Sequence, residues 1–144
     1  MALSIIDERG LEALSMRALA QRLGVFPTAI YWYTENKNAI LSDVAAFVLE
    51  GITPTQTDAD WRVWVRTLLI NYRTSISKHP NVASLIGARI VSNTAVDFFL
   101  IESLLNVLEQ AGFKDASLVR AYNAIFAGML GFVTLEFASM PDTD

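Results

Sequence analysis

The stretch LSMRALAQRLGVFPTAIYWYTENKNAIL, residues 14–41, decides how this chain folds. Ser15 is a good N-cap for a helix, and Gly24 suits the left-handed backbone position that ends one. Pro27 fits the first turn of the next helix, because the N–H that proline lacks would be unpaired there anyway. Asn36 is a good cap for a further helix. The stretch therefore predicts successive short helices joined by tight turns.

Apolar residues at helical spacing continue on both sides of this stretch, and no alternation typical of strands appears. Residues 51–60, GITPTQTDAD, form the clearest linker. We therefore expect an all-α fold with a three-helix N-terminal domain over residues 1–50. A larger helical domain follows over residues 51–144. The helices that we expect span residues 2–9, 16–23, 27–33, 37–49, 61–79, 81–89, 94–111 and 115–139.

The hydrophobic share of 53% is high for a chain of 144 residues. Its longest uncharged stretch, Ala121 to Leu135, has 15 residues, fewer than the roughly 20 that a membrane-spanning helix needs. The surplus apolar surface therefore favours a partner subunit, a ligand cavity, or both. The absence of cysteine excludes disulfides and thiolate metal sites. No basic segment precedes a cleavable apolar stretch, so nothing indicates secretion.

The net charge of −4 argues against a protein whose whole surface binds nucleic acid. The charge is unevenly distributed, because residues 15–37 hold three basic side chains against one acid, Glu35. These basic residues are Arg17, Arg22 and Lys37. We interpret Arg22 as a solvated charge on a helix face. Any contact with nucleic acid must be local to this window.

Three short helices separated by Gly10 and by Gly24-Val25 form the pattern in which a helix-turn-helix lies. In that motif the second helix of the pair enters the major groove, and its N-terminal residues contact base edges. Here that helix would be residues 27–33. Short helices joined by glycine also occur in ordinary helical bundles, so the spacing alone leaves both interpretations open.

The residue types in this stretch are more specific than the spacing. They resemble the N-terminal domain of the TetR family of transcriptional regulators, of the tetracycline repressor type, over about residues 1–50. Beyond residue 50 the resemblance is limited to the helical layout and to short matching segments such as ISKHP and EQAGF. The residues that carry the resemblance are Ser15, Arg17, Ala20, Leu23, Gly24, Val25, Tyr31, Asn36 and Lys37.

The resemblance implies a role for each exposed side chain of this domain. Thr28 and Trp32 would face base edges, and Tyr31 would place its hydroxyl on a phosphate. Lys37 would share a phosphate with the free N–H groups that open the fourth helix. Ser15 is equally well explained as a bare N-cap. The DNA-binding residues that we expect are Ser15, Arg17, Pro27, Thr28, Tyr31, Trp32, Tyr33 and Lys37.

Three features depart from the family pattern. Phe26 stands where a polar N-cap is usual, and phenylalanine is a poor cap. Thr34 replaces the usual apolar anchor, so we expect Tyr33 to be drawn toward the interior. The chain begins almost inside the first helix, so we expect the basic upstream arm of the family to be missing. We also expect a further helix to be missing after residue 144.

The sequence offers little for catalysis. His79 is the single histidine, and a histidine before a proline at a helix end is interpreted as a C-cap. No carboxylate cluster shows metal-binding spacing, and the glycines form no phosphate loop. We therefore predict that the chain is not an enzyme and needs no cofactor or metal.

The resemblance implies that the larger domain binds a small apolar or amphipathic effector and forms a dimer. Aromatic residues beside a few uncharged polar groups suit a pocket between helices. Small residues on the last helix permit close helix packing against a second subunit. The pocket candidates are Trp61, Trp64, Tyr72, Arg89, Asn93, Phe98, Phe99, Tyr122, Asn123 and Phe126. The dimer candidates are Ala124, Gly128 and Gly131.

The sequence therefore predicts a cytoplasmic, nucleoid-associated TetR-type regulator, most often a repressor. It would bind double-stranded operator DNA as a homodimer, without a membrane, and a small ligand would release it. The alternative is a helical ligand-binding or scaffold protein whose N-terminal domain does not bind DNA.

Overall fold

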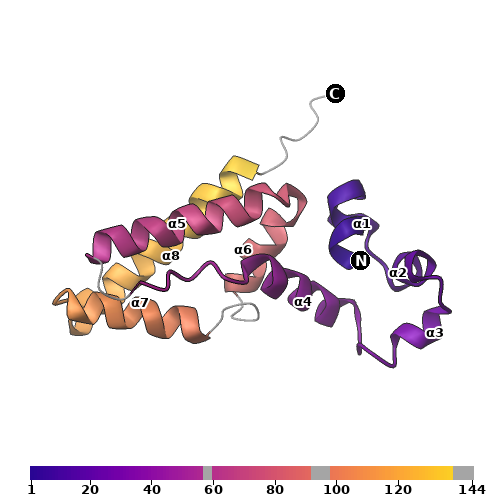
Figure 1. The fold of residues 1–144 in the computed structure, drawn as a ribbon, viewed down its shortest axis with the longest axis horizontal. Helices are drawn as coiled ribbons and strands as arrows, with labels where there is room; N and C mark the ends of the chain where they lie inside the picture. Colours follow the sequence, from indigo (N-terminus) through magenta and orange to yellow (C-terminus); the bar gives the residue numbers. More distant parts are fainter. Residues whose placement is uncertain (57–59, 92–97, 138–144) are drawn as a thin grey trace.

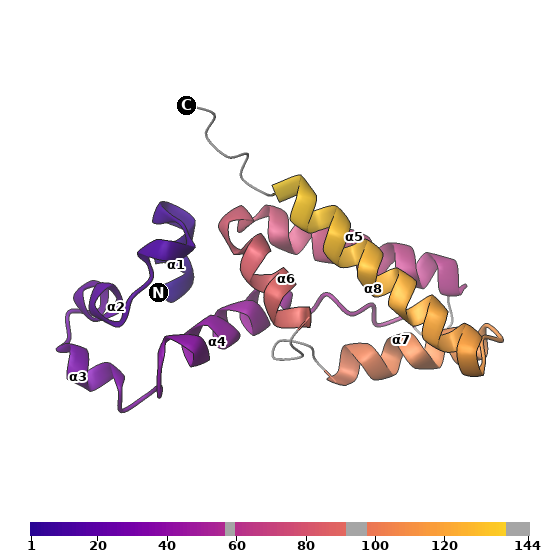
Figure 2. The ribbon, with the colours of Figure 1, turned by 180° about the vertical axis from the view of Figure 1, so that it is seen from behind.

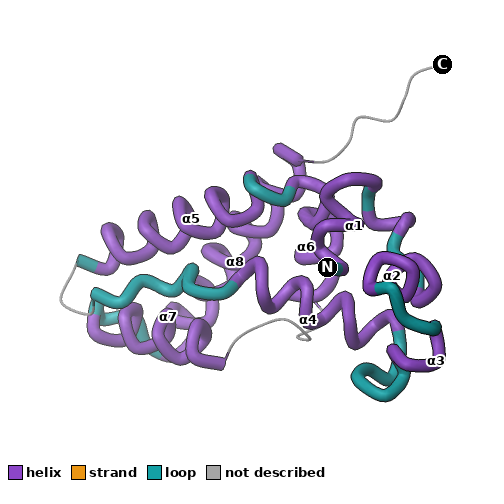
Figure 3. The backbone as a smooth tube through the Cα atoms, turned by 45° about the vertical axis from the view of Figure 1, so that its right-hand side comes forward, coloured by secondary structure: helices purple, strands orange, loops and turns teal. Residues whose placement is uncertain are grey.

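The computed structural model describes residues 1–56, 60–91 and 98–137, and these residues contain helices and no strand (Figure 3). The predicted all-α fold is thereby confirmed for the described part of the chain. The N-terminal elements are α1 (Ala2–Arg9), η1 (Leu11–Ala13), α2 (Met16–Leu23), α3 (Pro27–Ile30) and α4 (Lys37–Leu49). The later elements are α5 (Trp61–Ser77), η2 (Pro80–Val82), α6 (Ala83–Val91), α7 (Phe98–Gln110) and α8 (Asp115–Phe137).

The caps of α2 and α4 form as the sequence predicts. The hydroxyl of Ser15 accepts a hydrogen bond from the Ala18 N–H at 3.1 Å. The Asn36 side chain accepts one from the Ala39 N–H at 3.0 Å. Gly24 follows α2 with φ of 69°, the left-handed conformation that only glycine adopts without strain. Local sequence signals therefore determine where these two helices begin.

The third helix is shorter than predicted. Only Pro27–Ile30 is α-helical, and residues 31–33 form a turn in which the Tyr33 N–H donates to the Ile30 carbonyl at 2.9 Å. Phe26 contributes no side-chain cap hydrogen bond, so the helix lacks that stabilisation at its start. The prediction that Tyr33 turns inward is wrong, because its side chain is 93% exposed.

The larger domain packs α5, α7 and α8 side by side, with α6 crossing between them and α4 (Figures 1 and 2). The Trp61 ring at the start of α5 meets the Phe113 ring edge-on at 5.3 Å, just before α8. Near the other ends, Arg73 pairs with Glu136. Helices α5 and α8 therefore run in the same direction. Their core includes Trp64, Leu68, Tyr72, Ile76, Leu104, Leu108 and Met129.

The two parts of the chain meet at the C-terminal end of α1. The Asn81 amide donates to the carbonyls of Ile6 at 2.9 Å and Asp7 at 3.1 Å near the end of α1. The Ile6 carbonyl also accepts from the Gly10 N–H at 2.8 Å. His79 Nδ1 lies 2.9 Å from a carboxylate oxygen of Asp7. The interpretation of His79 as a C-cap is wrong: α5 ends at Ser77, and the histidine instead joins the two domains.

A second junction joins α4 and the linker to α5. The hydroxyl of Ser75 donates to the carbonyl of Val48 near the end of α4. The amide of Asn71 donates to the Ile52 carbonyl in the linker at 3.0 Å. Helix α4 runs from the turn after α3 to this junction (Figure 1). These bonds therefore connect the larger domain to the N-terminal helices.

Candidate nucleic-acid interface

The N-terminal domain places a cluster of aromatic side chains in solvent. Trp32 is 88% exposed, Tyr33 93% and Tyr31 57%. The buried residue among them is Ile30, at 4% exposed, which fixes the short helix to the core. Three adjacent amphipathic rings that lie mostly in solvent are costly as a bare surface, and they suit a surface that a partner covers.

Helix α3 presents the other predicted base contacts beside this cluster. Pro27 and Thr28 occupy its first turn, and both are exposed. The shortened helix therefore still offers its N-terminal residues to a groove. Trp32 and Tyr33, by contrast, stand on the turn that follows α3 rather than on the helix itself.

Two longer helices begin on the same domain, and each carries one of the predicted basic contacts in its first turn. Lys37 is the first residue of α4 and is half-buried, and Arg17 is exposed in the first turn of α2. Neither first turn contains an acidic residue. Both helix starts therefore combine a positive side chain with the positive end of a helix dipole, an arrangement that favours phosphate.

The structure gives Ser15 and Arg22 partners within the domain. The Ser15 oxygen accepts from the Ala18 N–H as a cap, and its O–H can still donate. Arg22 forms a two-pronged ion pair with Glu8, one N–O distance being 2.7 Å, and is not the solvated charge that we expected. The hydrogen bonds from Arg22 lower the pKa of the Glu8 carboxyl. The pair therefore ties α1 to α2 and neutralises both charges.

The predicted pocket residues that the structure describes lie in different environments. Trp64, Tyr72 and Phe126 are 2%, 0% and 9% exposed and belong to the core, whereas Phe98 and Phe99 are exposed at 87% and 59%. Trp61 packs against Phe113, Tyr122 packs against Phe126 at 4.6 Å, and Asn123 is exposed. The side chain of Arg89 and all of Asn93 lie outside the described residues.

One of these core residues has an unusual feature. The hydroxyl of Tyr72 is the one buried side-chain polar atom of the described residues without a hydrogen-bond partner. Burial raises the pKa of Tyr72 to about 12, so the group stays a neutral donor. Sequence reasoning included Tyr72 as an aromatic residue but had no signal for this orphaned hydroxyl.

The predicted dimer residues lie along an open apolar face of α8. Ala124 and Gly128 line a groove of about 530 Å³ between α5 and α8, together with Phe132. Gly131 is half-buried beside them. Phe132 is 82% exposed and Leu135 78%, and sequence reasoning missed both although they lie on the same helix. An exposed apolar face of this kind is typical of a surface that packs against a partner.

Helix α8 has 23 residues and is longer than its uncharged stretch. On length and composition alone it is apolar enough to cross a bilayer, with a mean hydropathy of 1.5 in a window that is 12% buried. Helices that pack into a core or a subunit interface meet the same criterion. The exposed groove against α5 favours the interface.

Comparison with known proteins identifies both parts of the chain. Residues 1–44 match the family described as bacterial regulatory proteins, tetR family, and residues 53–143 match the tetracyclin repressor-like C-terminal domain. The chain is 31% identical to the Escherichia coli tetracycline repressor protein class C, covering 99% of this chain and 66% of the relative. It is 30% identical to the class G protein of Vibrio anguillarum, covering 97% and 67%. The chain thus spans about two thirds of the length of these curated relatives.

Solved structures agree with these matches. BioQ bound to its natural double-stranded DNA operator superposes with a TM-score of 0.83 at 32% identity, covering 95% of this chain and 83% of that one. A TetR variant from Acinetobacter baumannii AYE in complex with minocycline gives 0.80 at 28% identity, covering 99% and 70%. The resemblance seen in residues 14–41 is confirmed, and this chain belongs to the tetR family of bacterial regulatory proteins.

Proposed function

We propose that this protein is a DNA-binding transcriptional regulator, a repressor that binds double-stranded operator DNA as a homodimer in the cytoplasm. The observation that carries the proposal is the exposed cluster Tyr31, Trp32 and Tyr33, which follows α3 on a helix-turn-helix. We assign DNA binding to residues 1–50 and effector binding and dimerisation to residues 51–144. The protein acts by binding, and we expect no catalysis.

The geometry supports base contacts by some residues of the N-terminal domain and phosphate contacts by others. Thr28 and Pro27, in the first turn of α3, enter the major groove, and Trp32 contacts bases or their methyl groups from the following turn. Tyr31 and Tyr33 keep a hydroxyl for the backbone. Lys37, Arg17 and the α4 N-terminus hold phosphates, which positions the domain without reading sequence.

A pair of substitutions tests this division. Lys37→Ala should weaken binding to every duplex about equally and reduce the salt slope by about one, because it removes one phosphate contact. Thr28→Ala should instead relax discrimination at one base-pair position by about 1–3 kcal/mol. Both are measured by fluorescence anisotropy on duplexes from the region upstream of the protein's own gene. If neither substitution changes binding, the recognition helix is wrongly assigned.

We propose that the larger domain holds a small amphipathic effector close to Tyr72. Its hydroxyl is a donor without a partner, surrounded by apolar residues of α5 and its neighbours. A ligand with one acceptor group in a mainly apolar body would satisfy it. The bonds from Asn71 and Ser75 to the linker and α4 then connect this region to the DNA-binding domain.

Tyr72→Phe should stabilise the ligand-free protein by about 1 kcal/mol. The substitution removes a buried polar group that has no partner, and the cost of leaving such a group unpaired is about 1–3 kcal/mol. Urea unfolding measures the change, with Tyr122→Phe, a half-buried tyrosine, as the matched control. Destabilisation by Tyr72→Phe would show that the hydroxyl has a partner in solution.

A further inference from the structure

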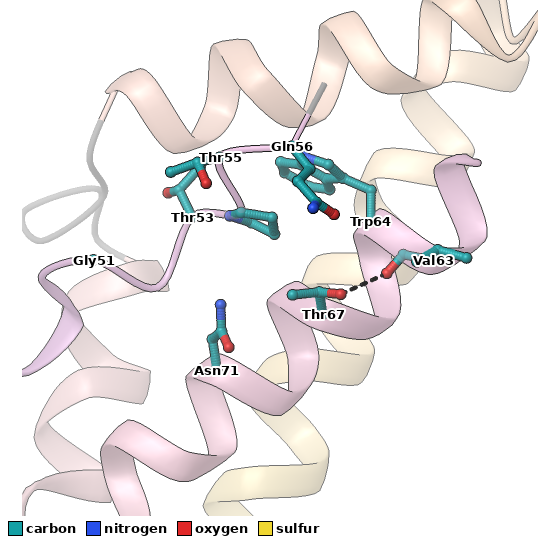
Figure 4. A pocket seen from close by; sticks show the side chains of 9 residues that line it. Gly51, Thr53, Thr55, Gln56, Val63, Trp64, Thr67 and Asn71 are labelled. Carbon is teal, nitrogen blue, oxygen red and sulfur yellow. Dashed lines mark hydrogen bonds between the residues drawn. The ribbon is translucent and has the colours of Figure 1, made fainter. Parts of the chain in front are cut away.

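A polar pocket lies between residues 51–56 and α5 (Figure 4). Its volume is about 290 Å³, near the lower end of the roughly 300–1,000 Å³ typical of ligand pockets. Tyr72 does not line it. Its hydrogen-bonding lining residues are Thr53, Thr55 and Gln56 from the linker, and Trp64, Thr67 and Asn71 from α5.

The chemistry of the lining is uniform. Six of the nine lining residues carry uncharged hydrogen-bonding side chains, and none is ionisable, although 18% of the chain is charged. A charged ligand would lose water here without gaining a counter-charge. The pocket therefore favours a neutral molecule with several polar groups.

Trp64 provides a donor that the protein itself leaves unused. The residue is 2% exposed, and its indole N–H makes no hydrogen bond to any described residue. The N–H is not among the enclosed atoms without a partner, as the Tyr72 hydroxyl is, and Trp64 lines the pocket. Buried indole N–H groups usually have a partner, and here an acceptor on a ligand would supply it.

Two acceptors are held in place beside this donor. The Thr67 hydroxyl donates to the Val63 carbonyl at 2.9 Å, which leaves its oxygen lone pairs free to accept. The Asn71 amide nitrogen donates to the Ile52 carbonyl at 3.0 Å, which leaves the side-chain carbonyl oxygen as an acceptor. A ligand that fits must therefore both donate and accept, and hydroxyl groups do both.

We propose that the pocket formed by residues 51–56 and α5 binds a neutral polyhydroxylated molecule of monosaccharide size. Trp64 donates its indole N–H to a ligand hydroxyl, while Thr67 and Asn71 accept from others. The inference goes beyond the proposed function, because binding at this pocket is measured without DNA and does not depend on operator recognition.

The test is a titration of the ¹⁵N-labelled full chain with glucose, followed on the three tryptophan indole signals. The Trp64 signal, assigned with Trp64→Phe, should move saturably, and those of Trp32 and Trp61 should stay. Glucuronate, which exchanges one hydroxymethyl group for a carboxylate, should bind at least about tenfold more weakly. An unmoved Trp64 signal, or equal binding of glucuronate, would overturn the proposal.

Variants locate the site independently of the tryptophan. Thr67→Val removes one acceptor without changing the shape and should weaken glucose binding by about threefold to tenfold. Thr74→Val, on the exposed side of the same helix and outside the pocket, is the matched control and should bind as the unmodified chain does. Gln56→Ala, in the exposed linker, should also weaken binding and carries no packing cost. Unchanged binding in both Thr67→Val and Gln56→Ala would place the ligand elsewhere.

Discussion

Replacing Trp32 with alanine is expected to weaken operator binding by about 10- to 100-fold, the effect of losing one good base contact. The free energy of unfolding should change by less than about 0.5 kcal/mol, because the side chain is 88% exposed and supports no packing. Affinity should change without stability because the Trp32 ring makes little contact in the free protein and becomes buried only when DNA is bound.

The matched control for this prediction is Phe98→Ala. Phe98 is as exposed as Trp32, at 87%, but it opens α7 in the larger domain. It should leave operator affinity unchanged. Anisotropy measures the affinity, and urea unfolding measures the stability. Equal loss of affinity in both variants would mean that exposed aromatics act through aggregation or folding rather than through DNA contact.

Phe132→Asp is expected to convert the dimer to monomer and to abolish tight operator binding. Phe132 is 82% exposed over the apolar groove between α5 and α8, so a partner subunit would cover it. Loss of a central interface aromatic costs about 2 kcal/mol or more, and an unpaired carboxylate in its place adds to this. Operator affinity should fall by about 10²–10⁴, because linking two recognition domains supplies a gain of that size.

Sedimentation velocity measures the oligomeric state, and Val119→Asp is the control on the same helix. Val119 is 57% exposed but does not line the groove, so this variant should remain dimeric. If Phe132→Asp remains a dimer, the subunits associate through another surface. A variant that becomes monomeric yet binds the full operator unchanged would contradict the linked-domain account.

The sequence predicted the helix boundaries that local chemistry determines. Ser15, Gly24 and Asn36 act through hydrogen bonds or backbone conformation within a few residues, so their effects can be read from the chain. The end of α3 could not be read in this way. The helix has four residues and no side-chain cap at its start, and the N–H groups of Tyr33 and Thr34 both donate to the Ile30 carbonyl at its end.

Contacts between distant residues explain the other differences. His79 and Asp7 are 72 positions apart, and Arg22 and Glu8 are 14 apart. No periodic pattern links such pairs, because they meet only when two helices have packed. Composition likewise showed surplus aromatics, but it could not separate Tyr72 in the core from Phe98 in solvent.

If this chain recognises an operator through its N-terminal domain, the purified protein should bind a palindromic duplex from its own upstream region. Its affinity, measured from about 50 to 200 mM salt, should fall steeply over this range. The protein should also prefer this duplex by about 10³-fold or more over a scrambled one of the same length. Equal, weak binding to both duplexes would instead indicate a helical ligand-binding protein that does not recognise DNA.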